Sequence, residues 1–83
     1  MVKNVEFSTD KFEDSIGLDV VVIGASAQQL EDLQHRLGNY YDANGLSSIE
    51  VNGNCIAMIF NVDEIPGSIE RVKGHICDLV MVM

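Results

Sequence analysis

Residues 49–62 read IEVNGNCIAMIFNV and predict a β-hairpin. Asn52-Gly53 at the centre favours a type I′ turn, which needs positive φ at both central positions. Residues 49–51 alternate between apolar and polar, as in a strand with one face in water. Residues 55–60 (CIAMIF) are almost wholly apolar, which is typical of a strand buried inside a sheet. The stretch therefore predicts two paired strands, of which the second is central.

A second central strand and a helix are predicted upstream of the hairpin. Residues 18–23 (LDVVVI) are rich in β-branched side chains, and Gly24 ends them. Ser26 begins a helix, because Ser26 and Gln29 have the spacing of a capping box. The apolar stripe of this helix comprises Leu30, Leu33 and Leu37, with Tyr40 or Tyr41.

The last part of the chain predicts a second helix and a final strand. Asp63 is the predicted N-cap, and Pro66 is acceptable in the first turn. The apolar stripe is Ile65, Ile69, Val72 and Ile76, and Gly74 is a predicted C-cap. Residues 78–83 (DLVMVM) then predict a strand. At the other end, residues 2–7 could form a short strand. Residues 8–17 fit either one helical turn opening at Asp10 or a loop anchored by Phe12 and Ile16.

The order of these elements predicts an α+β fold. We expect a single domain over residues 1–83, with residues 1–17 as an N-terminal extension and residues 18–83 as a βαββαβ core. This is the ferredoxin-like sandwich, a four-stranded antiparallel sheet with two helices on one face and here a possible extra N-terminal strand. Right-handed crossovers place residues 18–23 and 55–60 at its centre.

Composition and charge exclude several classes of partner. The chain has 83 residues, with 13 acidic against 5 basic side chains and a net charge of −8. Such a charge repels phosphate backbones and anionic lipids, so we expect neither nucleic-acid nor membrane binding, whereas a basic protein partner is favoured. No hydrophobic leader is visible, so we expect a cytoplasmic protein whose two cysteines are free thiols.

The second face of the predicted sheet needs a cover. Both predicted central strands and the predicted last strand are apolar on both faces, but two helices cover only one. The N-terminal segment, a ligand or a second subunit could supply the cover, and we expect a homodimer. The predicted interface is the uncharged edge strand formed by Leu79, Val80, Met81, Val82 and Met83.

Residues able to carry chemistry are few and scattered. His75, Cys77 and Asp78 lie close together, but only His35 and Cys55 remain elsewhere to complete a metal site, so we expect no metal. No nucleophile–base pair can be recognised, and we name no catalytic residue and no cofactor. The predicted helix N-terminus behind Gly24 could hold a small anion through its free amides.

At the level of pattern the chain resembles an ACT-type domain, a ferredoxin-like regulatory module. The resemblance covers residues 18–83 and depends on four features. These are the strand ending in Gly24, the Leu30/Leu33/Leu37 helix, Asn44-Gly45-Leu46 leading to Ile49, and Val72-Lys73-Gly74 before the last strand. It implies a non-enzymatic, ligand-sensing role. The residues that it implies for ligand binding are Gly24, Ala25, Ser26, Asn44 and Gly45.

Two other functions remain open. A small acidic interaction protein, an inhibitor or adaptor, would present the carboxylates of Glu31, Asp32, Asp63, Glu64 and Glu70 to a basic partner. A small dimeric enzyme would instead place a His or Tyr in a cavity against the sheet.

Overall fold

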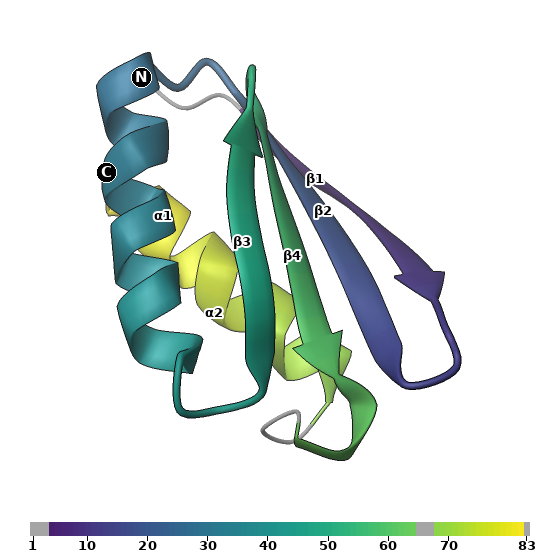
Figure 1. Cartoon of the computed structure of the whole chain (residues 1–83). Helices are drawn as coiled ribbons and strands as arrows, with labels where there is room; N and C mark the ends of the chain where they lie inside the picture. The colour runs from purple at the N-terminus through teal and green to yellow at the C-terminus, as the bar shows by residue number, and fades with distance from the viewer. Residues whose placement is uncertain (1–3, 65–67, 83) are drawn as a thin grey trace.

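The computed structural model describes residues 4–64 and 68–82. Figure 1 shows a sheet packed against two helices. In chain order the elements are β1 (Asn4–Lys11), β2 (Ser15–Ile23), α1 (Ala27–Tyr41), β3 (Leu46–Asn52), β4 (Cys55–Asn61), the 3-10 helix η1 (Val62–Glu64) and α2 (Ile69–Met81).

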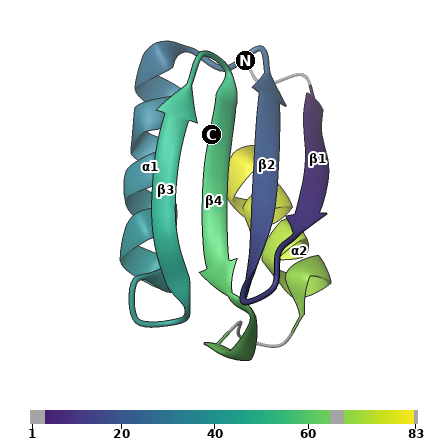
Figure 2. The ribbon, with the colours of Figure 1, turned by 45° about the vertical axis from the view of Figure 1, so that its right-hand side comes forward.

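The four strands form one antiparallel sheet in the order β1-β2-β4-β3. The central strands are β2 and β4, as predicted from their apolar sequences. Figure 2 shows both helices behind the sheet, α1 near β3 and α2 behind β1 and β2. The predicted α+β class with a four-stranded antiparallel sheet and two helices is thereby confirmed, and the arrangement is compatible with a ferredoxin-like fold.

The core lies between the sheet and the helices. Alternate residues of the central strands point into it, and each is at most 1% exposed: Leu18, Val20 and Val22 on β2, and Ile56, Met58 and Phe60 on β4. The predicted stripe of α1 is confirmed, with Leu30, Leu33, Leu37 and Tyr41 buried, and α2 contributes Val72, Ile76 and Val80. On β1, Val5 and Phe7 pack against this cluster.

The predicted final strand over residues 78–83 is wrong, because α2 continues through Asp78 to Met81. Met83 lies outside the described residues. The apolar stripe of α2 continues from Ile76 to Val80 at helical spacing, and the core buries both residues. The fourth strand is β1, which pairs with β2 after a short turn. Since β2 is already paired with β1 and β4, it has no free edge for a C-terminal strand.

The N-terminal segment is therefore part of the sheet. The helical turn considered at Asp10 is wrong, because Asp10 lies in β1 and pairs with Gly17. The backbone amide of Phe12 donates to the carbonyl oxygen of Ser15 at 2.8 Å and closes the β1–β2 turn. A turn this short costs little chain entropy, which favours local pairing over a distant strand. Val2, part of the predicted short strand, lies outside the described residues.

Two predicted element boundaries also differ from the structure. The β3–β4 register pairs Asn52 with Cys55, so Gly53 and Asn54 occupy the turn. Of these two turn residues only Gly53 has positive φ, at 61°, which is the sign pattern of a type II′ turn. This register sets Val51 opposite Ile56 in the core.

The second helix begins later than predicted. Asp63 lies in η1, and the N-cap of α2 is Ser68, whose hydroxyl accepts from the Arg71 amide at 3.4 Å. Ile65 and Pro66, which the sequence assigned to the start of this helix, lie outside the described residues.

Candidate functional site

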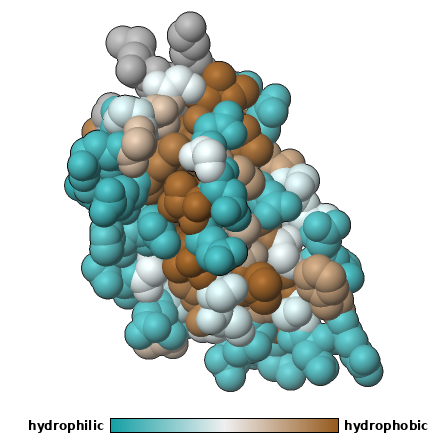
Figure 3. Space-filling model, turned by 45° about the horizontal axis from the view of Figure 1, so that its top comes forward, coloured by the Kyte–Doolittle hydropathy of each residue, from teal (hydrophilic) through white to brown (hydrophobic). Residues whose placement is uncertain are grey.

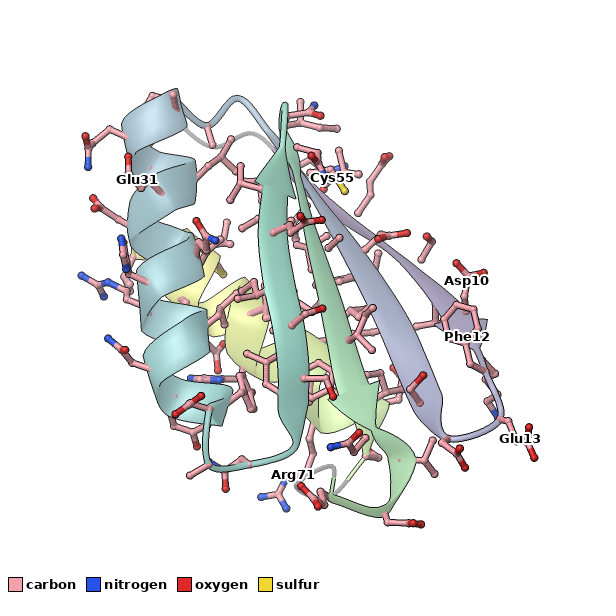
Figure 4. The ribbon with its side chains drawn as sticks, viewed as in Figure 1. Asp10, Phe12, Glu13, Glu31, Cys55 and Arg71 are labelled. Carbon is pink, nitrogen blue, oxygen red and sulfur yellow. The ribbon has the colours of Figure 1, made fainter. Side chains whose placement is uncertain are left out.

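A hollow lies between the C-terminal half of α1 and the middle of α2. We call it the helix groove. Its volume is about 600 Å³, and it is lined by Tyr40, Tyr41, Arg71, Val72, Gly74, His75 and Asp78. Arg71, His75 and Asp78 follow one another at helical spacing along α2, so they lie on one side of that helix. Figure 4 shows Arg71 projecting near the lower end of the molecule.

A hydrogen bond between the two helices holds the wall of the groove. The Tyr41 hydroxyl lies 2.8 Å from Nδ1 of His75, and the Tyr41 ring packs edge-on against Phe60 at a centroid distance of 5.5 Å. Burial, and to a smaller extent the neighbouring Tyr40, raises the pKa of Tyr41 to about 12. The hydroxyl therefore keeps its proton at neutral pH. It donates to Nδ1 in the tautomer of His75 that carries its ring proton on Nε2, and accepts from Nδ1–H in the other tautomer. In the first tautomer the Nε2 proton can serve a ligand.

Tyr40 adds an exposed aromatic surface beside this pair. Tyr40 is 56% exposed, and its ring lies 4.4 Å from the His75 ring, centroid to centroid, and 4.7 Å from the Tyr41 ring. Consecutive residues of a helix point about 100° apart, so when Tyr41 enters the core Tyr40 must face outward. The sequence predicted this division between the two tyrosines without assigning either ring. The structure shows that Tyr41 is the buried one.

A second hollow adjoins the helix groove. It has a volume of about 430 Å³, shares Tyr40 and His75 with the groove, and is otherwise lined by Arg36, Asn39 and Leu79. The Tyr40–His75 pair therefore lies between the helix groove, which Arg71 lines, and the second hollow, which Arg36 lines.

The charges around this pair contrast with the rest of the chain. Only five of the 83 residues are Lys or Arg, and two of these five are Arg36 and Arg71. Within residues 4–64 and 68–82 the salt bridge found is Lys73–Glu70 at 3.2 Å, and it uses neither arginine. Guanidinium groups bind carboxylates and phosphates through paired hydrogen bonds. Asp78 adds one carboxylate to the groove. A ligand whose anionic group pairs with an arginine could therefore also carry a hydrogen-bond donor or a cation that pairs with Asp78.

The side chains of the groove offer ring faces, a guanidinium, an imidazole and a carboxylate. Among the described residues that line it there is no Ser, Thr or Cys. In the part of the chain that the structure describes, no group of three His, Cys, Asp or Glu side chains could hold a metal ion. Both cysteines are free.

The residues that the sequence proposed for ligand binding do not lie together. Gly24, Ala25 and Ser26 precede α1, whereas Asn44 and Gly45 follow it, and a helix of 15 residues is about 22 Å long. The two groups therefore lie at opposite ends of α1.

Each of the two groups also has a local structural role. The predicted capping box is confirmed: the Gln29 amide donates to the Ser26 hydroxyl at 3.1 Å, and the Ser26 amide donates to Oε1 of Gln29 at 2.9 Å. These bonds occupy groups that an anion would need. Asn44 donates to the Tyr40 carbonyl oxygen at 2.8 Å, and Gly45, with φ of 90°, packs against the backbone of Glu64.

Four of the five residues predicted for the interface, 79–82, lie at the C-terminal end of α2. Val80 is buried at 6% exposure and Leu79 is half-buried, so both serve the core of this chain. Met81 and Val82 are 84% and 76% exposed. Met83 lies outside the described residues.

Sequence reasoning missed the helix groove because its contacts join distant parts of the chain. Tyr41 and His75 are 34 positions apart, and periodicity reports which face of a helix is buried but not which residues meet across two helices. The predicted C-cap at Gly74 also placed His75 outside the second helix, whereas it lies within α2. The adjacent pair Tyr40-Tyr41 at the end of an apolar stripe was the available signal.

Comparison with known proteins identifies no relative: no protein-family model, curated protein or solved structure matches this chain. Among the described residues no helix has the length and apolar character that crossing a membrane requires.

Proposed function

We propose that this protein is a non-enzymatic binding module that holds a small planar anion in the helix groove. The Tyr41–His75 hydrogen bond is the observation that carries the proposal, because it fixes an imidazole ring beside the exposed Tyr40 ring. A planar ligand would stack against Tyr40, and its anionic group would pair with Arg71. Nε2 of His75 would donate a further hydrogen bond.

The proposed role of this binding is regulatory, as the resemblance to ACT-type domains implies. In such a role the module senses the concentration of a metabolite and transmits its binding to a partner or a second subunit. We include a homodimer in this proposal. Its support is the exposed apolar pair Met81 and Val82 at the end of α2.

Benzoate and phenyl phosphate, with benzyl alcohol as the uncharged comparison, test the proposal in a titration followed by amide chemical shifts. The two anions should shift the signals of Tyr40, Arg71 and His75, and benzyl alcohol should bind more weakly. Arg71→Gln should weaken benzoate binding about tenfold, because it removes a charge-assisted hydrogen bond worth about 1.5 kcal/mol. Tyr40→Ala should also weaken it.

Lys11→Gln is the matched control, since it removes one exposed positive charge on β1, outside the groove. Equal affinity for benzoate and benzyl alcohol would contradict the role of Arg71. Shifts confined to residues 24–26 and 44–45 would mean that the ligand binds at the residues predicted from the sequence and not in the helix groove.

A further inference from the structure

The sheet face that the helices leave uncovered has a distinct arrangement of side chains, and we call it the open face. The register places on it every second residue of each strand, alternating with the core residues. From edge to edge its members are Asn4, Glu6, Ser8 and Asp10 on β1, Ser15, Gly17, Asp19, Val21 and Ile23 on β2, Cys55, Ala57, Ile59 and Asn61 on β4, and Ser48, Glu50 and Asn52 on β3.

An apolar strip runs along the middle of the open face. Val21 pairs with Cys55, and Gly17 pairs with Ile59, which is 38% exposed. Phe12 extends the strip: its ring is 58% exposed and would contact a side chain at position 17 at 3.4 Å, so glycine at this position leaves room for the ring. Figure 3 shows one side of the molecule, on which apolar atoms, in brown, lie among hydrophilic atoms, in teal.

Carboxylates flank this strip on both sides. Glu6 and Asp10 lie on β1 at one edge, and Glu50 lies on β3 at the other. Figure 4 shows Asp10 and Phe12 next to each other at the hairpin end of β1. Asp19 lies within the strip, opposite Ala57. Burial and then the Asp19 carboxylate raise the pKa of the Cys55 thiol, in keeping with a negative charge close to the strip.

Positive charge is absent from this face among the strand residues that the structure describes. Lys11, the basic residue of β1, pairs with Ile16 and lies on the helix side. A symmetric contact between two copies through the open face would set four carboxylates of one copy against four of the other. Like charges across an interface are unfavourable, and the whole chain carries a net charge of −8. The arrangement therefore favours a basic occupant over a second copy.

The spacing of the two acidic edges suits a helix. Neighbouring strands lie about 4.8 Å apart, so β1 and β3 are separated by three spacings, or about 14 Å. An α-helix with its side chains is about 10–12 Å across. A helix lying along the strip could place apolar side chains on Ile59 and Phe12. Its Lys or Arg side chains could then reach the carboxylates on either side.

We propose that the open face docks a basic amphipathic helix of a partner protein. The apolar stripe of that helix covers Val21, Ile59 and Phe12, and its cations pair with Glu6, Asp10, Asp19 and Glu50. This surface lies on the opposite side of the sheet from the helix groove, so the proposal is independent of the ligand proposed above.

A synthetic Leu/Lys peptide with its leucines at helical spacing tests the proposal, alongside a peptide in which Glu replaces every Lys. Binding measured by calorimetry should be detected for the Lys peptide and absent for the Glu peptide. Amide shifts should map to the four strands of the open face. Ile59→Ser should weaken binding about tenfold, as truncation of an apolar contact near the centre of an interface does.

Two charge-matched double variants separate a specific surface from general attraction. Asp19→Asn with Glu50→Gln should weaken binding and reduce its salt dependence. Glu31→Gln with Asp32→Asn makes the same charge change on the exposed side of α1 and should leave binding within twofold of wild type. Circular dichroism verifies that each variant is folded.

Three outcomes would overturn the proposal. An equal loss in both double variants would mean that the peptide responds only to total charge. Amide shifts confined to α1 and α2 would place the peptide elsewhere. A dimer in solution that Ile59→Ser converts to a monomer would identify a second copy as the occupant.

Discussion

Tyr41 connects the core with the helix groove. Its ring is 2% exposed and packs on Phe60, while its hydroxyl reaches His75 on the other helix. The sequence predicted that either Tyr40 or Tyr41 would complete the stripe of α1. The partner of its hydroxyl could not be predicted, because a hydrogen bond across two helices depends on how those helices pack.

Tyr41→Phe should lower the free energy of unfolding by about 1 kcal/mol, since it removes one hydrogen bond and keeps the ring. It should also change how the free energy of unfolding depends on pH. The pKa of Tyr41 is about 12 in the folded chain against an ordinary value of 10, so the unfolded chain loses this proton first as pH rises. Its contribution is fully present below about pH 10 and is lost as pH rises toward 12. Urea unfolding at pH 8 and pH 11 measures both effects.

The control is Tyr40→Phe, which leaves the Tyr41–His75 bond intact. This variant should keep the steeper loss of stability at high pH that the wild type shows. An unchanged pH dependence in Tyr41→Phe would contradict the assignment of that loss to the buried hydroxyl.

Gly74 shows why the C-terminal end of α2 was not predicted. In the sequence it is a plausible C-cap, but α2 continues through it to Met81. It is not among the glycines with positive φ, and a side chain added to it would meet nothing within 4 Å. The stripe formed by Val72, Ile76 and Val80 is buried, and this burial outweighs the weak helix propensity of glycine.

Gly74→Ala should raise the free energy of unfolding by about 0.5–1 kcal/mol, because alanine restricts the unfolded chain and suits a helix interior. Gly45→Ala makes the same chemical change at a position with φ of 90°, where the added carbon would lie 2.7 Å from the Glu64 carbonyl oxygen. It should destabilise the fold by more than 1 kcal/mol. Thermal and urea unfolding of both variants provide the comparison. A destabilising Gly74→Ala would show that the helix ends there.

At the level of the whole molecule, the exposed end of α2 and the open face differ in charge. Met81 and Val82 are apolar and exposed, whereas the open face carries four carboxylates. If the chain dimerises as proposed, contact through α2 avoids the repulsion that the open face would produce. The contact that the sequence placed on an edge strand would then be a helix contact.

Met81→Lys should convert the proposed dimer into a monomer, because it adds a charge to the apolar contact. Light scattering over a range of concentrations measures the solution mass. Val62→Lys is the control, since Val62 is 43% exposed and lies in η1, before α2 begins. A wild-type chain that is monomeric at every concentration would exclude the dimer.

The sequence by itself determined the α+β class, the two central strands and the capped first helix, because each depends on local periodicity or on a turn residue. The composition of residues 18–23 and 55–60 predicts buried strands, and the spacing of Ser26 and Gln29 predicts a helix cap. Only the tertiary structure decided that β1 takes the edge beside β2, that residues 78–81 are helical, and that Tyr41 meets His75. A short apolar run suits a strand or a helix equally, and the space left beside its neighbours in the folded chain selects between them.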